Sequence, residues 1–172
     1  MKFSCFALLG MLAAAPALAE TLADLNDLQI AHAAYTADLI DIRYAHLALA
    51  LSSNDTVRAF AKTMISDHEA VNAKALALLT KLGATPEDNF LSQSLNSGAE
   101  AKIAEQVALK GADSDRAYAA NELAYHQAVN GLVNGAFIPI IENPEVKALF
   151  EEASVIFPQH EGHAEMMVAA VK

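Results

Sequence analysis

Cysteine and tryptophan are almost missing from this chain of 172 residues, which contains one cysteine and no tryptophan. The single cysteine, Cys5, lies inside an apolar N-terminal run that we expect to be removed, so the mature chain has none. This excludes a disulfide framework, a thiolate metal site, a Cys-x-x-Cys-His haem attachment and a thiol nucleophile.

Basic and aromatic residues are also scarce. The chain has 11 Lys and Arg against 21 Asp and Glu, a net charge of −10, and only 6% aromatic residues. An acidic chain repels a phosphate backbone, so nucleic acid is not expected as a partner, whereas cations and basic partners are attracted. The dominance of Ala and Leu argues against an all-β fold, and 54% apolar residues argue against disorder. The length suits one domain.

Residues 1–19 have the pattern of a secretory signal peptide. Met1-Lys2 is a short basic start, Phe3 to Leu12 is an apolar run, and Ala17-Leu18-Ala19 is a cleavage signal. The run is shorter than the roughly 20 residues that a permanent membrane anchor needs, and no later stretch is apolar enough to insert. We therefore predict an exported, periplasmic protein whose single domain covers residues 20–172.

The rest of the chain repeats apolar residues at steps of three and four, which is typical of amphipathic helices. Turn and cap residues, such as Asn54, Gly83 and Asn143-Pro144, separate the repeats. Long helices are expected at about 25–49, 57–82, 113–137 and 144–167, with a loop over 84–98 and a short extra helix over 99–110. The predicted fold is all-α: an antiparallel four-helix bundle with one short helix in the connection between the second and third long helices.

Histidine carries the functional signal. Six histidines lie beyond the signal peptide: His32, His46, His68, His126, His160 and His163. In the first long helix, the apolar repeat through Leu28, Tyr35 and Leu39 places His32 and His46 in its seam. A rise of about 1.5 Å per residue puts all of the histidines except His46 in one belt of the bundle. Buried imidazoles need partners, and one ion shared among several of them satisfies them together.

We therefore predict a metal site made of His68, His126, His160 and His163, with His32 and Glu122 as further candidate ligands. For any single histidine, the alternative is a core residue hydrogen-bonded to a carbonyl or carboxylate, and this is the preferred interpretation of His46. Glu122 lies four residues before His126 on the same helix face. Other carboxylates near the belt are Asp41, Asp67, Glu69 and Glu161; of these, Asp67 and Glu69 are expected to face solvent.

The choice of metal follows from the donor atoms. The chain contains no Glu-x-x-His motif, so oxygen-activating di-iron chemistry is disfavoured. Imidazole-rich sites suit copper and zinc, and we place copper first. No convincing general base or nucleophile is evident, so an enzyme whose metal keeps an open position for water is ranked last.

Three segments resemble one protein family. Residues 57–68 followed by Asn72 resemble the VKxFAxxMxxDHxxxN signature of the exported bacterial proteins grouped as domain of unknown function 4142. The other two similarities are the Tyr…His…Val helix, in Tyr118, His126 and Val129, and the LPxLxxH ending, in Phe157, Pro158 and His163.

This resemblance implies a ferritin-like four-helix bundle in the periplasm or outer envelope, with His68, His126 and His163 as the family-matching histidines. It implies no established activity. The family usually carries a glutamate on its first helix, where this chain has the region from Asp41 to Arg43.

Two functions remain open at this point. One is a periplasmic metal-binding protein that sequesters, buffers or delivers copper or zinc. The other is a metal-free envelope bundle that acts through contacts with another periplasmic protein or in stress protection, with its histidines as packing or pH-responsive groups.

Overall fold

The structure is a computed structural model that describes residues 21–172, so the predicted signal peptide lies outside the described residues. Its elements are η1 (Leu22–Asp24), α1 (Asp27–Leu51), α2 (Asp55–Leu82), α3 (Phe90–Val107), α4 (Ala112–Leu132), η2 (Val133–Phe137), α5 (Ile138–Ile140) and α6 (Pro144–Ala170). No strand occurs in this part of the chain, which confirms the all-α prediction. Among residues 21–172, no helix has both the length and the hydropathy needed to span a membrane.

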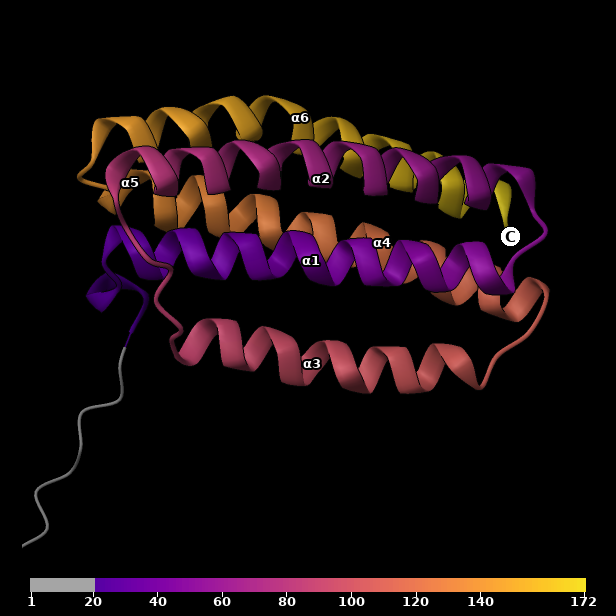
Figure 1. The fold of residues 1–172 in the computed structure, drawn as a ribbon. Helices are drawn as coiled ribbons and strands as arrows, with labels where there is room; N and C mark the ends of the chain where they lie inside the picture. Colours follow the sequence, from indigo (N-terminus) through magenta and orange to yellow (C-terminus); the bar gives the residue numbers. More distant parts are fainter. Residues whose placement is uncertain (1–20) are drawn as a thin grey trace, which may run out of the picture.

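The long helices lie alongside one another (Figure 1). Helix α1 packs against α2, α3 and α4, and α6 packs against α2 and α4. Figure 1 shows α3 running beside α1, away from α2 and α6. Helix α1 therefore has helical neighbours on three sides, and its contacts decide what lies at the centre of the molecule.

Asparagine side chains begin four of the long helices. Asn26, Asn54, Asn89 and Asn143 each accept hydrogen bonds from two backbone N–H groups in the first turn of the helix that follows. These N–H groups have no partner within the helix, so the asparagine oxygen satisfies them. Gly83 ends α2 with φ 61°, a left-handed conformation that favours glycine. The predicted caps at Asn54, Gly83 and Asn143 are confirmed.

Arg58 ties the start of α2 to the end of α1. Its guanidinium donates to the backbone carbonyl oxygens of Leu49, at 2.6 Å, and Ser52, at 2.9 Å. We expect Arg58→Ala to lower the free energy of unfolding by about 1–2 kcal/mol, because two partly buried carbonyls lose a charged donor. Urea denaturation measures this loss. Arg116→Ala, which removes an exposed arginine paired with Asp113, is the matched control and should stay within about 0.5 kcal/mol of the parent.

The predicted loop over 84–98 is wrong in its second half, because α3 already begins at Phe90. The segment is rich in Ser and Asn, which favours a loop, but Asn89 caps it as a helix and Leu95 packs against the core. Ser92 and Gln106 are themselves buried beside Ala99 on the inner side of this helix, whereas most of its other polar residues are exposed. Tertiary packing of the apolar face thus outweighs weak helix propensity.

The predicted inner face of the first helix is also wrong. Leu39 is 41% exposed and His46 is exposed, whereas Ala33, Ala45 and Ala48 are almost completely buried. Small side chains allow helices to approach closely, and α1 must fit among three neighbours. The alanine-rich face therefore turns inward, and Asp38 and Asp41, which lie on that face, are buried with it.

Candidate metal centre

Three histidines from three different helices meet in the interior. His68 comes from α2, His126 from α4 and His160 from α6, and all three are buried. Their ring centroids lie 5.2 to 5.9 Å apart. One ring nitrogen of each lies within 4.8 Å of the others, a spacing that would allow all three to bind one ion.

Each imidazole is oriented by a hydrogen bond at its other nitrogen. His68 Nδ1 donates to Asp38 Oδ1 at 2.7 Å, His126 Nδ1 to the backbone carbonyl of Glu122 at 2.9 Å, and His160 Nε2 to Asp67 Oδ2 at 2.9 Å. His126 Nε2 and His160 Nδ1 have no hydrogen-bond partner, and His68 Nε2 faces the Asp41 carboxylate, whose Oδ2 lies 2.6 Å away. A histidine that binds a metal has this arrangement, with one nitrogen fixed by an acceptor and the other left for the ion.

Two carboxylates complete the cluster. Asp41 and Glu122 are fully buried, and they form a second group of mutually close ligand atoms together with His126. Asp41 Oδ2 lies 2.6 Å from His68 Nε2 and 3.7 Å from His126 Nε2. His126 has only one free ring nitrogen and can therefore serve one ion. The two overlapping groups thus describe a single centre with up to five donors.

The carboxylates set the charge of the central histidine. Burial alone would lower the pKa of His68, but the flanking carboxylates of Asp38 and Asp41 raise it to about 10. The same contacts lower the pKa of Asp41 despite its burial. In the metal-free protein, His68 is therefore an imidazolium held between carboxylates.

The other two imidazoles of the centre are neutral near pH 7. Burial lowers the pKa of His126, and it lowers the pKa of His160 to about 4. Burial and the neighbouring Asp41 charge raise the pKa of Glu122 well above its usual value. Two neutral imidazoles are in the protonation state that a metal ligand requires.

Aromatic side chains enclose the centre. Phe157 stacks on His68, with ring centroids 5.5 Å apart and an interplanar angle of 20°. Phe60 and Tyr125 each approach His126 edge-on, at 6.3 Å. This apolar shell lowers the local dielectric constant and strengthens electrostatic interactions inside it.

The structure brings together four of the six residues predicted as ligands. His68, His126 and His160 form the cluster, and Glu122 lies beside His126. His163 is exposed, because the inward face of α6 passes through Phe157, His160 and Ala164.

His32 also lies outside the cluster. It is half-buried, and its Nδ1 is 3.8 Å from Asp88 Oδ1 in the connection between α2 and α3. The assignment of His32 and His46 to an inward seam fails for the reason given above: α1 turns its alanine-rich face inward.

Sequence reasoning missed Asp38 and understated two other aspartates. Asp41 was placed only near the belt, and Asp67 was expected to face solvent, although its 39% exposed side chain binds His160. A signal was present: Asp38 and Asp41 are three residues apart in a stretch rich in alanine, which is the face that packs most closely.

Comparison with known proteins adds a family but no function. No curated protein and no solved structure matches this chain. The family model described as Domain of unknown function (DUF4142) matches residues 12–167, which is most of the chain and includes every residue of the metal centre. The chain therefore belongs to the DUF4142 family.

Proposed function

We propose that this protein is an exported, periplasmic metal-binding protein that holds one transition-metal ion among His68, His126, His160 and Asp41. The observation that carries the proposal is the convergence of three buried imidazoles, which offer nitrogens within 4.8 Å of one another and are each anchored by a hydrogen bond at one ring nitrogen. In this proposal α1, α2, α4 and α6 form an antiparallel, ferritin-like four-helix bundle around the ion, and α3 is the extra helix.

Unsatisfied polar atoms favour an ion over a purely structural cluster. The Glu122 oxygens, His126 Nε2 and His160 Nδ1 are buried without hydrogen-bond partners, and the Asp41 carboxylate is fully buried beside the His68 imidazolium. Each such atom costs about 1–3 kcal/mol when it loses water without replacement. A cation would satisfy nitrogens and carboxylate oxygens at the same time, and it would replace the proton that lies between His68 Nε2 and Asp41 in the metal-free protein.

The donor set favours a borderline divalent metal. Three imidazole nitrogens and one carboxylate oxygen suit copper(II) and zinc, whereas Mg²⁺ and Ca²⁺ prefer all-oxygen sites. We place copper first because it binds a given nitrogen and oxygen site more tightly than zinc does. Zinc is the second choice.

Burial of the centre supports a binding role rather than catalysis. All four proposed ligands are less than 5% exposed. The acidic chain attracts cations, and the enclosed centre favours retention of an ion over turnover of a substrate. Sequestration, buffering or delivery of copper or zinc is therefore the proposed activity.

The test is metal content and affinity of the untagged mature protein. After removal of metal with a chelator, titration with Cu²⁺ and with Zn²⁺ should give about one bound ion per chain by elemental analysis. The melting temperature should rise with free metal concentration, because the ion binds the folded state. His126→Ala should abolish stoichiometric binding. His163→Ala, which removes an exposed histidine of α6, should leave it in place.

A protein that binds neither ion, with a melting temperature indifferent to both, would contradict the proposal. The metal-free envelope bundle acting through a protein partner would then be the better explanation. Equal loss of binding in His126→Ala and His163→Ala would place the ion somewhere other than the buried centre.

Asp67 offers a milder test of the same site. It is not a ligand in the proposal, but it fixes the orientation of the His160 ring. Because its side chain is partly exposed to water, we expect a variant at this position to remain folded. We expect Asp67→Asn to weaken metal binding by about 10-fold, the lower end of the usual range for such a partner. Competition with a coloured chelator measures the change. Glu69→Gln, an exposed neighbour, should leave the affinity unchanged.

A further inference from the structure

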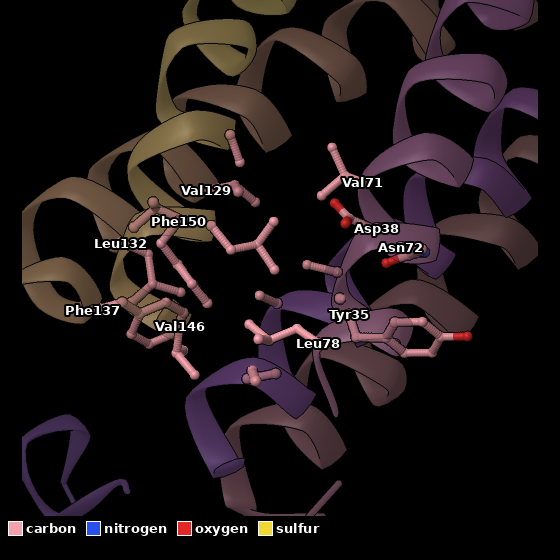
Figure 2. Close-up of a pocket in the computed structure, with 18 of the residues that line it drawn as sticks. Tyr35, Asp38, Val71, Asn72, Leu78, Val129, Leu132, Phe137, Val146 and Phe150 are labelled. Atoms are coloured by element: carbon pink, nitrogen blue, oxygen red, sulfur yellow. The ribbon is translucent and has the colours of Figure 1, made fainter. Parts of the chain in front are cut away.

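A narrow apolar cavity of about 60 Å³ lies beside the candidate metal centre (Figure 2). Its walls come from α1, α2, α4, η2 and α6, with Leu95 of α3, and Figure 2 shows Val129, Phe137 and Phe150 facing Val71 and Leu78 across it. Almost all of its lining side chains are apolar. The cavity would therefore exclude ions and favour an uncharged occupant.

Polar groups occur at one part of the wall. Asp38 and Asn72 line the cavity together, on the side of α1 and α2 (Figure 2). The Asp38 carboxylate is already engaged by His68. Asn72 is 6% exposed, and neither its amide nitrogen nor its amide oxygen has a hydrogen-bond partner.

Asn72 has no part in the metal centre. It belongs to the sequence signature that ends four residues after His68, yet it is absent from both groups of close ligand atoms. A buried amide without partners costs about 1–3 kcal/mol. Its position on the wall of an otherwise apolar cavity points to a ligand that supplies the missing hydrogen bonds.

The π-helical segment η2 gives a second, independent indication. Val133 and Phe137, at the two ends of η2, are both buried and both line the cavity. A π-helical turn is rare and is frequently found at functional sites. The cavity thus lies where α4 departs from regular helix geometry.

From these observations we infer that the cavity binds a small uncharged molecule with an apolar body and one hydroxyl-type head, which pairs with the Asn72 amide. A hydroxyl fits both unmet groups, because it donates to the amide oxygen and accepts from the amide nitrogen. The volume limits the body to a few carbon atoms, since an engineered cavity of about 150 Å³ holds benzene. This inference does not depend on the metal centre.

The experiment uses the metal-free protein with labelled Val and Leu methyl groups, 1-propanol as the probe, and xenon as an apolar probe without a head. NMR titration should shift the methyl signals of Val71, Val129 and Leu132 with both probes. Asn72→Leu, which replaces the amide by an apolar group of similar size, should weaken propanol binding at least tenfold and leave xenon binding in place.

A cavity-filling variant completes the test. Ala153→Leu adds three carbon atoms to the wall and should remove the shifts from both probes; Ala34→Val, on α1, serves the same purpose if the first variant does not fold. Three results would overturn the inference: no shift with propanol, xenon binding without propanol binding, or equal propanol affinity in the parent and in Asn72→Leu.

Discussion

Replacing His68 with alanine lowers the free energy of unfolding of the metal-free protein by about 3–5 kcal/mol, the usual result of removing one partner from a buried ion pair. His68 lies between Asp38, at 2.7 Å, and Asp41, at 2.6 Å, and all three side chains are buried. Without the imidazolium, two carboxylates must stay charged in an apolar interior or take up protons. Either outcome favours the unfolded chain, in which both carboxylates are hydrated.

Urea denaturation at pH 7 in the presence of a chelator measures this change. His46→Ala is the matched control, because His46 is exposed, and it should change the stability by no more than about 0.5 kcal/mol. In an Asp38→Asn background the loss caused by His68→Ala should shrink by about 1–3 kcal/mol, since the two residues are in contact. A loss below about 1 kcal/mol in the parent background would show that His68 does not carry the charge of this cluster.

The stability of the metal-free protein falls as the pH rises from about 6.5 towards 10. The flanking carboxylates raise the pKa of His68 from 6.5 to about 10, so in this range the folded protein holds a proton that the unfolded chain releases. The contribution of His68 is therefore complete below pH 6.5 and is lost as the pH approaches 10. Such a group changes the free energy of unfolding by up to about 1.4 kcal/mol per pH unit.

Other buried groups also affect how the stability of the metal-free protein depends on pH. The raised pKa of Glu122 acts in the same direction as that of His68, because this carboxyl holds its proton to a higher pH in the folded protein than in the unfolded chain. The lowered pKa of His160, about 4, acts in the opposite direction: stability is lost as the pH falls from 6.5 towards 4. The metal-free protein should therefore be less stable both in acid and in alkali than near neutrality.

Chemical denaturation between pH 6.5 and 9.5 tests the alkaline decline. In His68→Gln the decline should be shallower than in the parent by about 1 kcal/mol per pH unit, because the titrating group is gone. His46→Ala should follow the parent profile. A parent stability that rises over this range would contradict the assignment of a charged His68.

Local sequence signals were sufficient where the interaction itself is local. Asn54 and Asn143 cap helices because each oxygen reaches N–H groups two and three residues ahead, and Gly83 ends α2 because it adopts a positive φ. The same logic failed for the start of α3. There, the polar composition suggested a loop, whereas Leu95 contributes to a core built from distant residues.

The candidate site was predictable only in part. The positions of His68, His126 and His160 follow from the apolar faces of their own helices, since each lies in step with buried neighbours such as Met64 and Phe157. Asp38 and Asp41 were not recoverable in this way. Their burial depends on the rotation of α1 about its axis. In an alanine-rich helix the faces differ too little in hydrophobicity for the sequence to define that rotation.

The amino-acid sequence alone determined that this chain is helical, where most helices begin and end, and which imidazoles turn inward from α2 and α4. These properties depend on residues within one or two turns of each other. Only the tertiary structure decided which face of α1 meets the core, and with it the pairing of His68 with two aspartates and the exclusion of His32 and His163. Those outcomes depend on how closely three neighbouring helices approach α1, and that distance is fixed by packing between segments far apart in the chain.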